Sequence, residues 1–267
     1  MTPLPRLMVA PNGARRGKAD HPALPITDDE IVETAQACQG AGADGLHVHI
    51  RDERGRHLLD AGRYRALLDR LGDAVPGMYL QVTSEAAGCY EAAEQRAMMR
   101  KLKPAHVSVG LREMVRKPED WPEARDFYHW ARDTGVEIQH ILYSPHEVGA
   151  FAVACASGLI PGTSQAVIFV QGSYANGSRD SIALGEYLQP LSRAGDVAFD
   201  WMVCAFGAEE TASLVRAAEL GGKARVGFEN SLWNANGEVA VDNAARVREV
   251  FAALQGVGRP VVSQPTN

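Results

Sequence analysis

The chain has 267 residues, of which 46% are hydrophobic and 22% charged, and its formal net charge is −6. This composition is typical of a folded globular protein, and the excess of acidic residues argues against nonspecific binding to nucleic acid or anionic membranes. The length fits one (β/α)8 barrel, so we expect a single domain over residues 1–267.

The four cysteines are far apart and form no CxxC pair, which favours reduced thiols over a disulfide framework or a cysteine zinc site. The N-terminal segment lacks the long apolar core of a signal peptide, and no apolar run approaches the ~20 residues of a membrane span. We therefore expect a cytoplasmic protein with small-molecule partners rather than nucleic acid or membrane.

Short apolar segments that end at Gly, Pro or Ser recur along the chain, as is typical of buried strands. The eight expected strands are Leu7–Ala10, Gly45–Ile50, Tyr79–Thr83, His106–Val109, Glu137–Tyr143, Ala166–Gln171, Asp200–Ala205 and Ala224–Phe228. Helical patterns follow the Thr27–Glu30 capping box to the Gly40–Gly42 region and cover Asp60–Leu71, Ala92–Leu102, Pro118–Thr134, Pro145–Ser157, Ile182–Arg193, Ala208–Leu220 and Asp242–Leu254. This alternation predicts a parallel (β/α)8 TIM barrel, with an open doubly wound sheet as the alternative, because periodicity does not show closure.

The segment GLHVHIR at residues 45–51 is the strongest functional signal. Alternate side chains of a strand face the same way, so His47, His49 and Arg51 are expected on one face, with Arg51 as a candidate substrate contact. Two histidines at this spacing can bind one metal ion, and their place at the catalytic end of a barrel strand favours this over hydrogen-bonded core histidines.

The segment RVGFEN at residues 225–230 carries the second signal. Arg225, Gly227 and Glu229 are expected on one face, and Gly227 is expected to leave room for a ligand or ion. Because the second and eighth strands both neighbour the first, Glu229 can approach His47 and His49. Two histidines and one carboxylate form a catalytic type of metal site, whereas a salt bridge at the barrel rim is the alternative for Glu229.

Other polar residues follow the expected strands. Thr83 and Ser84 are candidate ligands of a substrate carboxylate, and Glu85 is a candidate base, with helix or loop capping as the alternative. Asn12 begins a turn suited to an anion, and Ser108 is expected to line the pocket. The sequence contains no P-loop, so it does not predict ATP binding of that type.

Three motifs occur in order along the chain: NGA at residues 12–14, AGADGLHVHIRD at 41–52 and RVGFE at 225–229. Together they resemble the β-keto acid cleavage enzymes, which include the 3-keto-5-aminohexanoate cleavage enzyme of lysine fermentation. The resemblance implies a TIM barrel, commonly a homotetramer, in which His47, His49 and Glu229 bind zinc or another divalent transition metal. It also implies that a β-keto acid and acetyl-CoA give acetoacetate and a new CoA thioester. Arg15 and Arg16 are candidate contacts for CoA phosphates.

In the family reaction, the metal chelates the keto acid, C2 loses a proton, and the enolate attacks the thioester carbonyl. Arg225 matches an arginine that works with an acidic residue after the metal-binding glutamate. This chain has Asn230 at that acidic position, and an asparagine does not take up a proton at neutral pH. It also has Thr83-Ser84-Glu85 where the family often has Ser-Thr-Gly, so we hypothesise that Glu85 is the general base.

Two other functions stay open from the sequence. The same site can serve a CoA-independent metal-dependent lyase, aldolase or hydrolase. A barrel that has lost its base and only binds a metal-chelating acid is the other alternative, and Asn230 is its sole support. Within the leading function, Arg225 and the metal alone could acidify C2 without Glu85.

Overall fold

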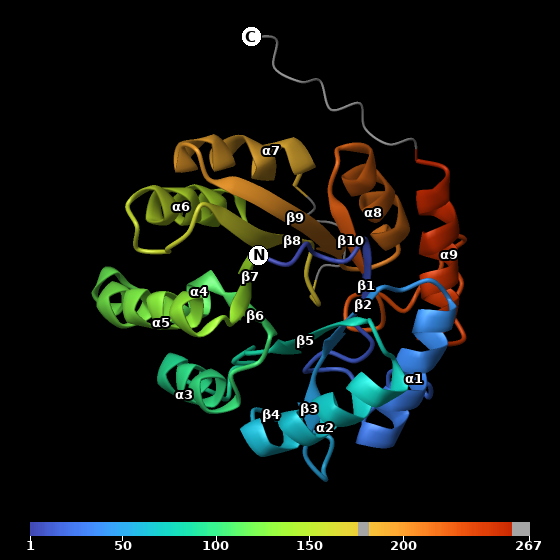
Figure 1. Cartoon of the computed structure of the whole chain (residues 1–267). Coiled ribbons are helices and arrows are strands. Elements are labelled where there is room, and N and C mark those ends of the chain that lie inside the picture. Colours follow the sequence, from blue (N-terminus) through green and yellow to red (C-terminus); the bar gives the residue numbers. More distant parts are fainter. Residues whose placement is uncertain (176–181, 258–267) are drawn as a thin grey trace.

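The computed structural model of the chain describes residues 1–175 and 182–257. Eight parallel strands close into a barrel in the order β1-β10-β9-β8-β7-β6-β5-β2, surrounded by helices (Figure 1). The barrel strands are β1 (Leu7–Val9), β2 (Gly45–Val48), β5 (Tyr79–Thr83), β6 (His106–Gly110), β7 (Glu137–Leu142), β8 (Ser164–Gln171), β9 (Ala198–Ala205) and β10 (Lys223–Val226). Closure confirms the predicted TIM barrel and shows that the open doubly wound sheet is wrong.

The helices also follow the predicted order. They are α1 (Asp28–Gly40), α2 (Ala61–Ala74), α3 (Ala92–Leu102), α5 (Trp121–Thr134), α6 (Pro145–Ala156), α7 (Leu184–Leu188), α8 (Glu210–Glu219) and α9 (Asn243–Gln255), with a short α4 (Leu111–Met114) after β6. The predicted capping box is present, since the Thr27 hydroxyl accepts from the Glu30 amide at 3.2 Å and the Glu30 carboxylate accepts from the Thr27 amide at 3.0 Å. The prediction of a single helix over 182–193 is wrong. The α-helix α7 ends at Leu188, and Pro190 lies in the 3-10 helix Gln189–Ala194 that follows it.

Both strands that lead to the candidate metal ligands end earlier than predicted. Strand β2 stops at Val48, and His49 lies between it and β3 (Ile50–Arg51), which pairs antiparallel with β4 (His57–Leu58). Strand β10 stops at Val226, so Glu229 lies on the turn beyond it. His49 still lies beside His47 as predicted, with the two Nε2 atoms 3.1 Å apart. The predicted strand face is wrong for Arg51, which lies on the β3–β4 hairpin, and for Glu229, which lies on a turn.

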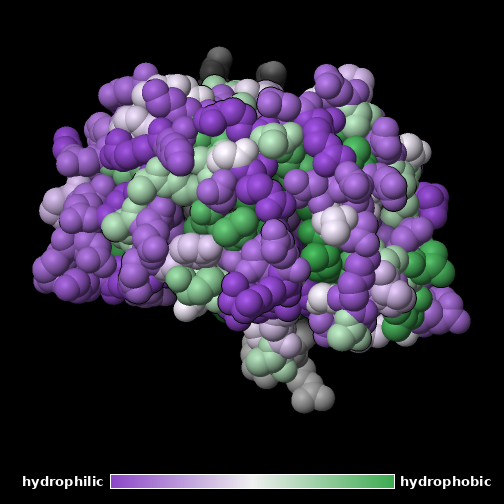
Figure 2. Space-filling model, turned by 90° about the horizontal axis from the view of Figure 1, so that it is seen from below, coloured by the Kyte–Doolittle hydropathy of each residue, from purple (hydrophilic) through white to green (hydrophobic). Residues whose placement is uncertain are grey.

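The barrel interior and the helix layer hold the apolar core. Inside the barrel, Met8, Ile168 and Met202 belong to one buried cluster, while a larger cluster fills the space between strands and helices. The outer face seen from below, where α1 and α2 lie in Figure 1, is mostly hydrophilic with small apolar patches (Figure 2). None of the helices in the described part of the chain is long and apolar enough to cross a membrane.

Gly227 is required for close packing of two backbones. Its φ is 138°, and an added Cβ would lie 2.5 Å from the Ala10 carbonyl oxygen and 3.0 Å from Asn243 Oδ1. The prediction that this glycine leaves room for a ligand is wrong, because the backbone after β1 fills that space. The glycine instead lets the turn that carries Glu229 lie directly against β1.

We expect Gly227→Ala to lower the free energy of unfolding by about 1–3 kcal/mol more than Gly237→Ala. Gly237→Ala is the control. Gly237 also has a positive φ, 83°, but nothing lies within 4 Å of an added Cβ, so this variant measures the cost of alanine at a positive φ without a steric collision. Urea denaturation of both variants measures the difference. If both variants lost the same free energy of unfolding, the close approach to Ala10 would not contribute to the cost of Gly227→Ala.

Candidate active site

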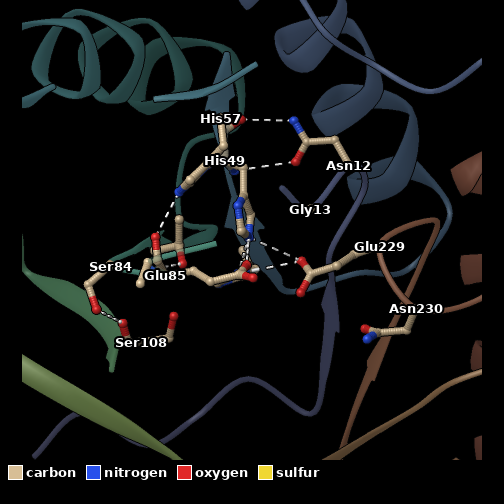
Figure 3. A network of polar contacts seen from close by, with 12 residues as sticks. Asn12, Gly13, His49, His57, Ser84, Glu85, Ser108, Glu229 and Asn230 are labelled. Atoms are coloured by element: carbon tan, nitrogen blue, oxygen red, sulfur yellow. Dashed lines mark hydrogen bonds and ion pairs between the residues drawn. The ribbon is translucent and has the colours of Figure 1, made fainter. Parts of the chain in front are cut away.

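Three buried side chains converge at the mouth of the barrel, and Figure 3 labels two of them, His49 and Glu229. One ligand atom from each of His47, His49 and Glu229 can be chosen so that all lie within 4.8 Å of one another. Glu229 Oε2 is 3.5 Å from His47 Nε2 and 3.4 Å from His49 Nε2, and the two Nε2 atoms are 3.1 Å apart. Glu229 Oε2 is buried and has no hydrogen-bond partner among the described residues. These atoms fit a shared cation, which would satisfy all three.

The pKa shifts of His47 and Glu229 favour the protonation states that bind a cation. Burial lowers the pKa of His47 to about 3, so its ring is neutral. Burial alone would raise the pKa of Glu229, but Arg225 and the two histidines outweigh it and hold that pKa well below its usual range. Two neutral imidazoles and one carboxylate are the form in which these residues bind a metal.

A hydrogen bond orients the His47 ring, and a further histidine packs beside the His49 ring. His47 Nδ1 lies 2.8 Å from Gln81 Oε1, which accepts a hydrogen bond and leaves Nε2 free for a metal. The ring of His57 lies 5.2 Å from the ring of His49. The Nε2 atom of His57 lies 2.8 Å from the Glu85 carbonyl oxygen. His57 and Gln81 were not predicted, since nothing in their local sequence shows which residues they will contact.

Asn12 and Arg51 hold the loop around His49. The Asn12 amide donates to the His49 carbonyl at 2.8 Å and accepts from the His49 amide at 3.3 Å (Figure 3). Arg51 donates to the carbonyls of Gly13, Arg16 at 3.0 Å and Gly55 at 2.8 Å. The side-chain amide of Asn12 and both terminal guanidinium nitrogens of Arg51 are engaged within the protein, so these contacts favour positioning roles over the predicted contact with substrate.

The turn that carries Glu229 is fixed in the same manner. The Phe228 amide donates to Asn243 Oδ1 at 2.9 Å, and Asn243 Nδ2 donates to the Pro11 carbonyl at 3.0 Å. Arg16 Nη1 donates to the Phe228 carbonyl at 2.6 Å. This bond favours a structural role for Arg16 over the predicted contact with CoA phosphates.

Arg225 lies against the carboxylate of Glu229. Its Nη2 donates to Glu229 Oε1 at 2.9 Å, to Asn230 Oδ1 at 3.3 Å and to the Cys204 sulfur at 3.4 Å. The Asn230 amide nitrogen is buried without a hydrogen-bond partner in the described segments, so it can donate to a bound molecule. Burial raises the pKa of the Cys204 thiol to about 11, so this cysteine is a neutral hydrogen-bonding group and not a nucleophile.

A pocket of about 250 Å³ opens beside these residues. Four residues singled out in the sequence line it in addition to His47, Arg225 and Glu229, namely Arg15, Thr83, Glu85 and Asn230. Glu85 Oε2 lies 3.9 Å from His49 Nε2, which places a carboxylate next to the candidate metal site.

Two residues that were predicted to lie at the substrate site, Ser84 and Ser108, are not among the residues that line this pocket. Ser84 donates its hydroxyl to the Ser108 carbonyl at 2.8 Å, and both serines are fully buried (Figure 3). Ser84 and Ser108 therefore support the strand ends, and direct contact with substrate stays a prediction for both.

Four aromatic or cationic pocket residues were not predicted from the sequence: Arg112, Tyr143, Tyr174 and Phe206. The Arg112 guanidinium lies 3.3 Å from the centroid of the Tyr143 ring, and the guanidinium groups of Arg15 and Arg16 lie over Tyr174. Arg112 follows a strand end, and that position was the one signal that could have identified it.

Sequence comparisons agree with the geometry. A profile described as "beta-keto acid cleavage enzyme" matches residues 6–266. The "3-oxoadipate:acetyl-CoA acetyltransferase" of Cupriavidus necator is 29% identical over 96% of this chain and 90% of that protein. The "3-keto-5-aminohexanoate cleavage enzyme" of Acetoanaerobium sticklandii is 26% identical, covering 94% of this chain and 92% of that protein.

Solved structures support the fold. The structure titled "Apo structure of ObcA" superposes with a TM-score of 0.68 at 17% sequence identity. The alignment covers 90% of this chain and 63% of the other, so this chain spans less than two thirds of that protein's length. At this identity the likeness shows a shared barrel fold.

Proposed function

Since the chain belongs to the beta-keto acid cleavage enzyme family, as its motifs predicted, we propose that it cleaves a small β-keto acid with acetyl-CoA as co-substrate. The products are acetoacetate and a new acyl-CoA. The observation that carries the proposal is the convergence of His47, His49 and Glu229 beside Arg225 in a pocket at the barrel mouth. The relative named for acetyl-CoA transfer supports the choice of co-substrate.

The proposal assigns His47, His49 and Glu229 as ligands of one divalent transition metal ion. Zinc is preferred because two imidazoles and one carboxylate with further open positions are typical of catalytic zinc. When bound, the ion supplies Lewis-acid polarisation of the keto oxygen. The unpartnered Oε2 of Glu229 and the neutral ring of His47 support this assignment.

Glu85 is the proposed general base. Its carboxylate lines the pocket and lies 3.9 Å from His49 Nε2, so it is near the expected position of the keto acid. It takes the proton from C2 of the keto acid, and the C2 carbanion attacks the acetyl carbonyl. The CoA thiolate leaves and then attacks the original keto carbon, which breaks the C2–C3 bond and forms the new acyl-CoA. The C2 carbanion of the departing acetoacetate takes the proton back from Glu85.

Other pocket residues are proposed to stabilise and orient the reacting groups. Arg225 stabilises negative charge that develops on the keto acid oxygens, because it is buried and fixed by Glu229. Asn230 donates its free amide hydrogen to the substrate in place of the acid–base role of the family aspartate. Thr83 contributes its hydroxyl to the substrate carboxylate, and Arg15 contacts CoA phosphates at the rim.

Isotope labelling tests the reaction itself. With acetyl-CoA labelled in the acetyl group, we expect the label in acetoacetate and not in the new acyl-CoA, because the acetyl carbonyl becomes bonded to C2 of the keto acid. Mass spectrometry of both products distinguishes the outcomes. Consumption of the keto acid without acetyl-CoA would instead support the CoA-independent lyase or hydrolase.

We expect Glu85→Gln to lower kcat by about 10²–10⁴-fold without loss of bound metal, since a positioned base contributes on this order. Steady-state kinetics and metal analysis on the same sample measure both quantities. Glu53→Gln is the matched control, because Glu53 is an exposed carboxylate on the nearby β3–β4 turn. Full activity of Glu85→Gln with the metal retained would remove Glu85 as the base.

A further inference from the structure

A second cationic group lies across the barrel mouth from Glu229. Arg112 is on α4, directly after β6, and lines the same pocket as His47 and Glu229. In the closed ring of eight strands, β6 stands opposite β10, the strand that leads to Glu229. A small molecule bound at the metal ligands can therefore extend its other end towards Arg112.

Arg112 is held in the pocket, and its charge is available. Its guanidinium carbon lies 3.3 Å from the centroid of the Tyr143 ring, which fixes the group by cation–π contact. The neighbouring Glu113 is engaged elsewhere, since its carboxylate accepts from Gln95 Nε2 at 2.8 Å and from the Ala86 amide at 3.2 Å. Arg112 has no ion pair within residues 1–175 and 182–257, whereas Arg225 is paired with Glu229.

The charge of the pocket also favours an additional anion. Its lining includes three arginines (Arg15, Arg112 and Arg225) against two glutamates (Glu85 and Glu229). Arg225 is paired with Glu229 and Arg15 is proposed to contact CoA, so Arg112 is the lining arginine that is left for a further anion. The volume of about 250 Å³ suits a short acid better than a long acyl chain. A guanidinium group matches a carboxylate with two parallel hydrogen bonds.

We propose that Arg112 binds a second carboxylate at the far end of the substrate, so that the enzyme prefers β-keto diacids to β-keto monoacids. This inference rests on the proposed function, because the first carboxylate and the keto oxygen are placed at the metal ligands. The phosphates of CoA are a less suitable partner for Arg112. The long pantetheine arm separates them from the thioester, which has to reach the same pocket.

Calorimetric binding to the metal-loaded protein in the absence of acetyl-CoA tests the inference. The probes are 3-oxoadipate, a six-carbon keto diacid, and 3-oxohexanoate, the keto monoacid of equal length. We expect the native protein to bind the diacid at least 10-fold more tightly. We expect Arg112→Ala to weaken diacid binding about 10–100-fold and monoacid binding less than 3-fold, as for loss of one charged hydrogen-bonding partner.

Arg116→Ala is the matched control, because Arg116 lies just beyond α4 but pairs with Glu91 outside the pocket and its loss should leave both affinities unchanged. Arg112→Lys should restore part of the preference for the diacid. Equal affinity of the native protein for both acids, or equal weakening of both by Arg112→Ala, would overturn the inference. A rise in the KM of acetyl-CoA alone would assign Arg112 to the CoA phosphates and overturn it as well.

Kinetics separate this inference from the reaction proposed above. If the native enzyme converts the monoacid at least as well as the diacid, the diacid preference fails and the reaction stands. If neither acid is converted with acetyl-CoA, the reaction fails, and the calorimetric ratio still decides the role of Arg112.

Discussion

Glu229→Gln is expected to lower the kcat/KM of the acetyl-CoA-dependent reaction by about 10³-fold or more and to leave the protein largely free of metal. The substitution keeps the shape of the side chain and removes its charge. A neutral amide is a weak ligand, and two neutral imidazoles alone do not compensate the charge of a divalent ion. Arg225 would also lose its 2.9 Å ion-pair partner and would repel the metal.

Elemental analysis after dialysis, together with kinetics on the same sample, measures this effect. Glu238→Gln is the control, because Glu238 is an exposed carboxylate on the loop after Glu229 that interacts with Asn236. Metal retained at the native level in Glu229→Gln, with unchanged activity, would show that Glu229 is not a ligand.

Arg225→Met is expected to reduce kcat/KM by about 10²–10³-fold, the usual cost of losing one positioned group that stabilises developing negative charge. It should also make metal binding more sensitive to pH. In the native protein, Arg225 and the histidines hold the pKa of Glu229 well below its usual range, against the effect of burial. Without Arg225, burial is less opposed and the pKa of Glu229 rises.

The direction of this pH effect follows from the competition of protons with the metal. In the native protein, Glu229 stays ionised as the pH falls towards the ordinary carboxyl range, so protonation of Glu229 does not compete with the metal there. In Arg225→Met, protonation of Glu229 begins at higher pH, and metal affinity should fall more steeply on acidification. Metal titrations at several pH values measure this pH dependence of metal affinity. Arg225→Lys is the control, because it keeps the positive charge. Parallel pH profiles of native and Arg225→Met protein would contradict the coupling.

The barrel was predictable because its sequence signals are local. Each buried strand is a short apolar run, and the capping box at Thr27 and Glu30 identifies the start of α1 from four residues. His47 and His49 were likewise recognised as a pair from a spacing of two. Closure was the step that periodicity did not settle, because it depends on the pairing of β1 with both β2 and β10.

The predictions that were wrong concern side chains whose positions depend on contacts between loops that are distant in the sequence. The assignment of Glu229 to a strand face was wrong, since the turn after β10 is set by Asn243 and by the approach of Gly227 to Ala10. Arg51 leaves the barrel wall on the β3–β4 hairpin, which its sequence pattern did not indicate. Such contacts join residues dozens of positions apart, and side-chain periodicity carries no information about them.

The most direct test of the central claim is metal content and acetyl-CoA-dependent turnover of the native protein, measured before and after chelation. We expect about one divalent ion per chain, activity that disappears with the ion and returns when it is restored, and no turnover without acetyl-CoA. Activity that survives complete removal of the ion would contradict the assignment of His47, His49 and Glu229 as ligands of a catalytic metal.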